Sequence, residues 1–147
     1  MTATNHALSG ALIGAFLALP VAIPVALVSH FVLDALPHYG INHNHHSIPS
    51  TYKTVVFSDT AIALALAVTA AIFHKWDMLI AGSVAYLPDV SVVSYYLRHG
   101  GDMDIKAENK FMKFHLGIQH EYPWGIIPEL IVGATMFPIF IAQLLKS

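Results

Sequence analysis

The sequence predicts an all-α fold, a small polytopic membrane bundle of about five membrane helices, in a single membrane-embedded domain over residues 1–147. Hydrophobic residues make up 56% of the chain and charged residues only 11%, whereas roughly a quarter of a soluble domain is charged. Apolar runs of the length that a bilayer core requires, ~20 residues, recur along the chain. A chain of this length leaves room for one domain.

The first apolar run contains two short helices. Residues 7–36 are almost wholly apolar, but Pro20 and Pro24 interrupt the run near its middle. One helix over the whole run would be longer than the ~20 residues that cross a hydrocarbon core. We therefore expect helices over 5–18 and 21–36, followed by a polar loop.

The rest of the chain predicts three further membrane helices, over residues 52–74, 77–97 and 123–145. The segment 103–120 is of a different kind. Its lysines recur at helical spacing on one side, and its large apolar residues recur on another: Phe111, Phe114 and Ile118. This pattern is typical of an amphipathic helix in the membrane interface.

Five spans place most of the basic residues on the side of the N-terminus. Lys53, Arg98 and the lysines of segment 103–120 fall on that side, and only Lys75 and Lys146 on the other. By the positive-inside rule, the N-terminus is expected in the cytoplasm. The formal net charge of −2 argues against a nucleic-acid partner.

The same topology brings ionisable residues from distant segments to one membrane depth. His30 and Asp34 are four residues apart and share a helical face. Pro37 is expected to end their helix near Leu36, with His38 just beyond it. A helix end with a capping histidine is the structural alternative for one histidine alone. We nevertheless expect a metal site whose ligands come from several helices: His6, His30, Asp34, Asp59, Asp89 and His115.

Small residues indicate that these side chains point into the bundle. His6, Gly10 and Gly14 form one row at four-residue spacing, and rows of alanines precede His30 and follow Asp59. Such rows mark close packing of membrane helices. Carboxylates inside spans are costly and usually functional. No Lys or Arg lies within the same spans, so one or two divalent cations would relieve their repulsion.

The types of ligand limit the candidate metals without identifying one of them. The chain has no Cys, which excludes thiolate sites, and a set of His and Asp suits Zn, Mn or Fe. His6 and Asp59 have an alternative role as helix caps. The parts played by His38, His120, Glu121 and Glu129 stay open. The loop histidines are interpreted as solvated: His43, His45 and His46.

Three elements together resemble a known family. They are Asn5-His6 with Gly10 and Gly14, the segment from Ser29 to His38, and Leu87-Pro88-Asp89. They are similar to the YdjM-like (LexA-binding) proteins, small bacterial inner-membrane proteins described as metal-dependent hydrolases. Many members carry a Gly-His-Arg-Gly-x-Thr-His stretch that is absent here, and Phe114-His115 to Gln119-His120 stands in its place. The resemblance implies a bacterial inner-membrane hydrolase.

These observations predict a membrane-embedded metal-dependent hydrolase with its site near the cytoplasmic interface. Asp34, Asp89 and His115 are the expected catalytic residues. The expected substrate is an amphiphilic, lipid-like ester or phosphoester, because the site lies at headgroup depth. Two alternatives are a metal-ion transporter or metal-binding membrane protein, and a structural protein whose polar cluster only holds the helices together. The oligomeric state does not follow from the sequence.

Overall fold

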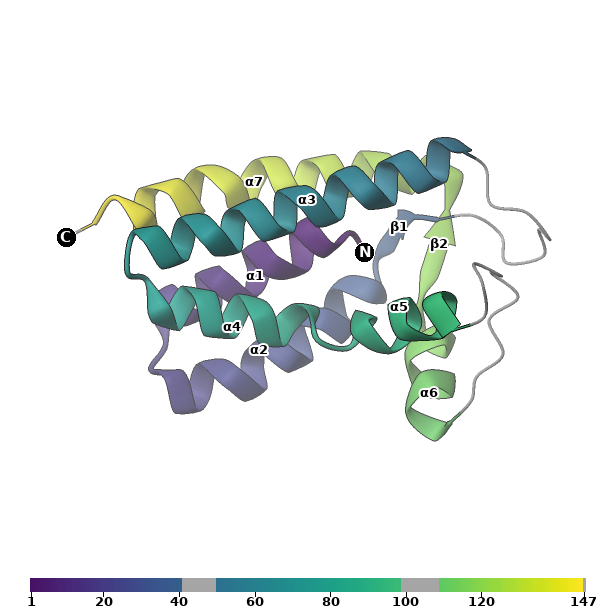
Figure 1. The fold of residues 1–147 in the computed structure, drawn as a ribbon, viewed down its shortest axis with the longest axis horizontal. Helices are drawn as coiled ribbons and strands as arrows, with labels where there is room; N and C mark the ends of the chain where they lie inside the picture. Colours follow the sequence, from purple (N-terminus) through teal and green to yellow (C-terminus); the bar gives the residue numbers. More distant parts are fainter. Residues whose placement is uncertain (41–49, 99–108, 147) are drawn as a thin grey trace.

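The computed structural model describes residues 1–40, 50–98 and 109–146. Helices run lengthwise through this part of the chain, and a short parallel pair of strands lies at one end (Figure 1). The elements in chain order are α1 (Ala3–Phe16), α2 (Leu19–Asp34), β1 (Pro37–Tyr39), α3 (Ser50–Ile72), α4 (Trp76–Tyr86), α5 (Asp89–Arg98), α6 (Lys110–Ile118), β2 (His120–Tyr122), the 3-10 helix η1 (Pro123–Gly125) and α7 (Ile126–Leu144). The all-α prediction is confirmed.

The first apolar run forms two short helices, as predicted. Leu17 and Ala18 are extended and separate α1 from α2. Pro20 stands in the first turn of α2, where the missing N–H of proline costs nothing. The helix ends at Asp34 rather than Leu36, because Pro37 starts a strand that runs away from it.

The one continuous helix expected over residues 77–97 is divided into two helices, so that prediction is wrong in its continuity. Its two parts, α4 and α5, are bent by 52°. Pro88 lies at the bend. Its ring clashes with the carbonyl four residues earlier and it has no N–H to donate. Asp89 therefore becomes the first residue of α5, directly after the break, instead of lying within a continuous helix.

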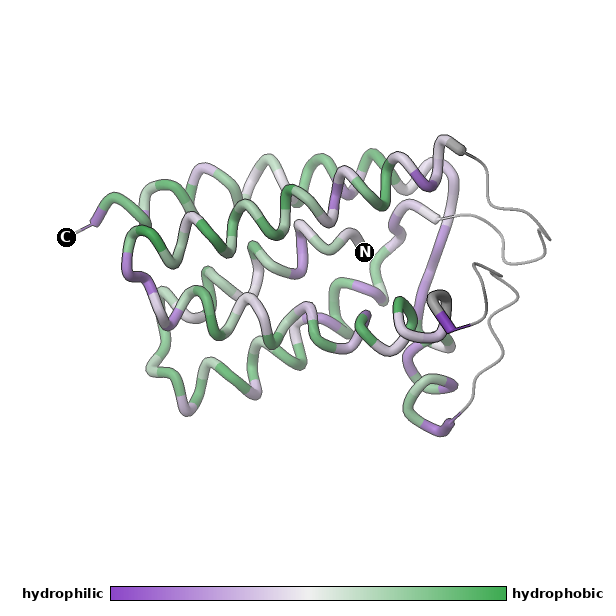
Figure 2. The backbone as a smooth tube through the Cα atoms, in the orientation of Figure 1, coloured by the Kyte–Doolittle hydropathy of each residue, from purple (hydrophilic) through white to green (hydrophobic). Residues whose placement is uncertain are grey.

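Two helices are long and apolar enough to cross a membrane, at Thr51–Ile72 and Pro123–Leu144, and the bent pair α4–α5 makes a third if it forms one span. In the most apolar 18-residue stretch of each, only 6% of the residues in the first and 17% in the second are buried within the protein. Figure 2 shows the apolar character of both along most of their length. With 14 and 16 residues, α1 and α2 are shorter than a span, so the structure leaves a five-span bundle unconfirmed.

Helix α1 lies inside the bundle in close contact with α4. A Cβ atom on Gly10 would lie 2.4 Å from the carbonyl oxygen of Ala81, and one on Gly14 would lie 2.2 Å from that of Asp77. Only glycine fits at such distances. On α2, Ala22 and Ala26 are completely buried. The rows of small residues on α1 and α2 therefore pack helix against helix, as predicted, whereas Ala63 and Ala67 in the row on α3 are only half-buried.

The strands bring α6 to the end of α2. They pair in parallel, with His38 opposite Glu121. The sequence analysis missed this pairing and treated the segment after Pro37 as loop. The helix expected over 103–120 is described only from residue 109 onward, where it forms α6. The expected residues 103–108 lie outside the described ranges. Asn109 caps α6, because its side chain accepts a hydrogen bond from the Met112 backbone N–H.

Replacement of Gly10 tests the contact between α1 and α4. Gly10→Ala forces a methyl group against the Ala81 carbonyl, and such overpacking costs about 1–3 kcal/mol. We expect a lower midpoint of thermal unfolding, measured by tryptophan fluorescence in detergent. Gly117→Ala is the matched control, since nothing lies within 4 Å of its added methyl group. Equal stability of both variants would contradict the packing described.

Candidate metal centre

Four side chains from α1, α2 and α5 converge in the bundle. His6, His30, Asp34 and Asp89 each offer one ligand atom, and these four atoms all lie within 4.8 Å of one another. The side chains of His6, His30 and Asp34 are fully buried, and that of Asp89 is 20% exposed. Their positions follow from the row of small residues on α1, the four-residue spacing on α2 and the bend before α5.

Asp34 lies at the centre of the group. Its Oδ1 atom is 3.1 Å from His6 Nε2, and its Oδ2 atom is 3.0 Å from His30 Nε2. The rings of His6 and His30 stack with their centroids 4.0 Å apart. Each of the two imidazoles thus presents its Nε2 atom to the carboxylate of Asp34.

The tautomer of neutral His30 is fixed by the backbone of α4. Its Nδ1 atom is 2.8 Å from the Ala85 carbonyl oxygen, which can only accept a hydrogen bond, so Nδ1 carries the proton. The last carbonyls of a helix lack intrahelical partners, and the break after Tyr86 leaves Ala85 in that position. Neutral His30 therefore directs the Nε2 lone pair at the carboxylate of Asp34. A hydrogen bond from Nδ1 to a backbone carbonyl is the usual support of a metal-binding histidine.

His115 joins the group from α6. Its Nε2 atom lies 3.0 Å from Asp34 Oδ2, 3.5 Å from Asp89 Oδ1 and 2.9 Å from His30 Nε2. Gln119, one turn later on α6, reaches the same nitrogen at 3.3 Å. We call the five residues the His/Asp cluster: His6, His30, Asp34, Asp89 and His115. Five of the six predicted ligands are thus brought together.

The sixth predicted ligand, Asp59, has a different position. Its two carboxylate oxygens accept hydrogen bonds from the backbone N–H groups of Ala3, at 2.7 Å, and Thr4, at 3.0 Å. It therefore caps the N-terminus of α1 from α3, where a negative charge also favours the helix dipole. Asp59 is not in the group of potential ligands found in the described ranges, and its role as a ligand stays a prediction.

Glu129 of α7 secures the same helix end. It is buried, and its carboxylate accepts hydrogen bonds from the backbone N–H groups of Thr2, at 3.1 Å, and Tyr39, at 3.2 Å. The side chain of Asn5 donates to its backbone carbonyl at 3.1 Å. Glu129 thus connects α1, β1 and α7, a positioning role that the sequence left open.

One cation near the cluster was missed by the sequence analysis. The amino group of Met1 contacts Asp34 Oδ1, and both are fully buried. No pattern in the sequence could indicate this contact, because it depends on how α1 enters the bundle. The amino group offsets one of the two carboxylate charges.

The remaining histidines lie outside the cluster or outside the described residues. His38 donates from Nδ1 to the Leu36 carbonyl at 2.8 Å, and burial lowers its pKa below the usual value. His120 is exposed and makes a similar local bond to Ile118. The loop histidines lie beyond the described ranges: His43, His45 and His46.

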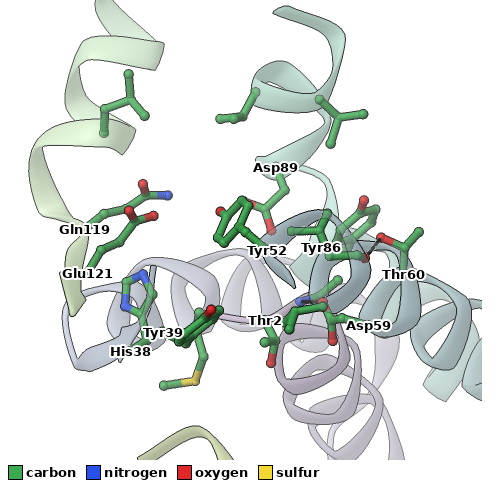
Figure 3. A pocket seen from close by; sticks show the side chains of 17 residues that line it. Thr2, His38, Tyr39, Tyr52, Asp59, Thr60, Tyr86, Asp89, Gln119 and Glu121 are labelled. Carbon is green, nitrogen blue, oxygen red and sulfur yellow. Dashed lines mark hydrogen bonds between the residues drawn. The ribbon is translucent and has the colours of Figure 1, made fainter. Parts of the chain in front are cut away.

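A cavity of about 150 Å³ opens beside Asp89. Figure 3 shows Gln119 and Glu121 on one side of it, and Tyr86 and Thr60 on the other. Apolar residues of α3 and α5 complete the wall: Val55, Val56, Val92 and Val93. Asp89 is the residue common to the cavity and the group of four potential ligands.

The donor set fits a divalent transition metal. Neutral imidazole nitrogens and carboxylate oxygens are ligands of Zn, Mn and Fe. Within the part of the chain that the structure describes, the Nδ1 atoms of His6 and His115 have no hydrogen-bond partner. Nothing therefore fixes the tautomers of these two histidines, and each Nε2 atom can present a lone pair, to an ion or to a proton. The structure identifies a group that could hold a metal ion and leaves the identity of the metal open.

Comparisons with known proteins do not identify the chain. No family model matches it, and neither a curated protein nor a solved structure shows significant similarity to it. The assignment of function therefore depends on the residues of the site.

Asp59→Asn separates the role of a helix cap from that of a metal ligand. The amide supplies one acceptor where two are used, so we expect a loss of about 1 kcal/mol in stability and an unchanged metal content. Thermal unfolding and plasma mass spectrometry of the same preparation give both values. Loss of metal from a variant that remains folded would show that Asp59 is a ligand.

Proposed function

We propose that the protein is a membrane-embedded metal-dependent hydrolase that cleaves an ester or phosphoester of an amphiphilic substrate. The observation that carries the proposal is the environment of His30 Nε2. In the neutral ring this atom bears a lone pair, and it lies 3.0 Å from a carboxylate oxygen of Asp34 and 3.8 Å from one of Asp89. Atoms that all present electron pairs repel one another. A second proton on the ring, a hydrogen bond donated by His115 Nε2 at 2.9 Å, or a cation shared by the three atoms relieves that repulsion.

A divalent cation satisfies the whole cluster, whereas a proton on His30 satisfies one atom. His6, His30, Asp34 and Asp89 would hold the ion. When bound, such an ion polarises the scissile group and lowers the pKa of a water molecule towards ~7. The metal content of the purified protein distinguishes one bound ion from two.

Three residues would perform the reaction. Asp34 and Asp89 would hold and orient the ion. Asp89 also borders the cavity, where the scissile bond would lie. His115 Nε2, 3.5 Å from Asp89 Oδ1, would accept a proton as the water oxygen bonds to the carbonyl carbon or phosphorus. The same proton then passes to the leaving oxygen as its bond breaks, so His115 ends unchanged.

The surroundings of the cluster suit a substrate that comes from the bilayer. Phe111 and Phe114 on α6 are 44% and 54% exposed, one turn from and adjacent to His115. Exposed aromatic residues next to lysines are typical of helices in the membrane interface. Lys53 and Arg98 fit a cytoplasmic position for this end of the molecule. We place the protein in the bacterial inner membrane, with a cytoplasmic N-terminus, on the resemblance to the YdjM-like proteins.

Metal content tests the first part of this proposal. The purified protein is expected to carry one or two equivalents of Zn, Mn or Fe by plasma mass spectrometry. His30→Ala and Asp34→Asn remove ligands, and each is expected to lower the content at least tenfold. His120→Ala is the control, because His120 is exposed and outside the cluster.

Circular dichroism of each variant shows whether the helices remain. A parent protein that holds no metal, and binds neither added Zn nor added Mn, would rule out the hydrolase. Metal bound without hydrolysis of any ester or phosphoester would instead favour the alternative of a metal-binding or metal-transporting membrane protein.

His115→Gln tests the proposed proton acceptor. Glutamine keeps much of the shape of histidine but cannot take up a proton at neutral pH, so hydrolysis is expected to slow about 100-fold or more while most of the metal is retained. Turnover and metal content are measured on the same sample. Full activity in this variant would assign the proton transfer to another group.

A further inference from the structure

A second cavity lies between α3 and α4, with α1 as its floor. It holds about 290 Å³ and is lined mainly by small or apolar residues. Figure 1 shows α3 and α4 side by side lengthwise, with opposite chain directions, and α1 between them. We call this cavity the α3–α4 groove.

The groove adjoins the cavity at the His/Asp cluster. Thr60 and Tyr86 line both of them. On one side of this pair lies Asp89 with the polar cavity, and on the other side lie alanines and leucines of the groove. An elongated molecule could therefore pass from the cluster into an apolar space without leaving the protein surface.

The shape of the groove follows from helical spacing. Thr60, Ala63, Ala67 and Ala70 recur at intervals of three and four residues and lie on one face of α3. Gly82 of α4 faces them. These small side chains leave a channel about 15 Å long from Thr60 to Ala70, at 1.5 Å of rise per residue. Such a channel fits a single extended acyl chain.

The charges at the polar end indicate the kind of head group. Asp59 and Glu121 border the cavity outside the proposed ion site, the amino group of Met1 contacts Asp34, and no Lys or Arg is found among the described lining residues. A phosphate monoester would bring two more negative charges next to these carboxylates. A head group without net charge avoids this repulsion. The hydroxyl groups of Tyr52 and Tyr86 line the cavity and can donate hydrogen bonds to such a head group or accept them from it.

From the position of this groove beside the cluster we infer that the substrate is a single-chain carboxylic ester with an uncharged head group. Its acyl chain lies in the α3–α4 groove and its ester group lies at Asp89. This inference rests on the proposed hydrolase function and names its substrate class. Water adds its hydroxyl to the acyl carbon, the bond to the alkoxy oxygen breaks, and that oxygen takes the remaining proton. The products are a fatty acid and an alcohol.

Closure of the groove at two depths tests this inference. Ala67→Phe blocks it about 10 Å from Thr60, and Ala63→Phe blocks it about 5 Å from Thr60. Ala65→Phe is the matched control, because Ala65 is exposed on the same helix and does not line the groove. Each variant is placed in nanodiscs and its metal content is measured first.

The probes are two ether analogues that no hydrolase can cleave, radiolabelled hexyl and dodecyl ethers of glycerol. Ala67→Phe is expected to weaken binding of the dodecyl ether at least tenfold and to leave the hexyl ether almost unaffected. Ala63→Phe weakens both, and the control weakens neither. Hydrolysis of p-nitrophenyl hexanoate and dodecanoate should follow the same order.

Binding and metal content distinguish failure of this inference from failure of the proposed function. Equal dodecyl binding in all variants would overturn the groove as the chain site and show that it only contacts bilayer lipid. Faster hydrolysis of an alkyl phosphate than of the ester would overturn the uncharged head group. If a protein that holds no metal still binds the ethers according to chain length, the groove is supported as the chain site and the hydrolase function is contradicted.

Discussion

Burying an ionised carboxylate among apolar helices costs several kcal/mol unless charges and hydrogen bonds compensate for it. Asp34 is fully buried; the amino group of Met1 contacts its Oδ1 atom, and three imidazole nitrogens lie around its two oxygens, where they would share the proposed cation with it. Every element that supplies one of these partners must be held near α2. The fold around the cluster can therefore be understood as the set of contacts that keeps Asp34 compensated.

Each contact has its own local cause. Glycines let α1 approach the backbone of α4 closely enough for His6 to reach the carboxylate. Pro88 breaks α4 from α5, which turns Asp89 towards the cluster and places the Ala85 carbonyl where it fixes the His30 tautomer. The parallel pairing of β1 with β2 holds α6, and with it His115, against the end of α2. Stability and site geometry thus depend on the same contacts.

The sequence predicted what depends on local spacing. Four-residue rows identified the inward faces of α1 and α2, and with them His6, His30 and Asp34. It did not predict the pairing of Pro37 with His120 or the capping of α1 by Asp59, which lies about 55 residues away in the chain. Such contacts depend on how whole helices are arranged, and the residue periodicity within one helix does not predict that arrangement. Asp59 looked like a ligand because a carboxylate in an apolar helix has the same pattern whether it binds an ion or backbone N–H groups.

X-ray absorption at the metal edge of the protein loaded with zinc tests the central claim most directly. The account predicts a first shell with two imidazole nitrogens, at about 2.0–2.1 Å, and carboxylate oxygens. It also predicts that Asp34→Asn abolishes this spectrum, while His120→Ala leaves it unchanged. A shell of oxygens without imidazole, or the same spectrum in all three proteins, would contradict the assignment of the His/Asp cluster as a metal centre.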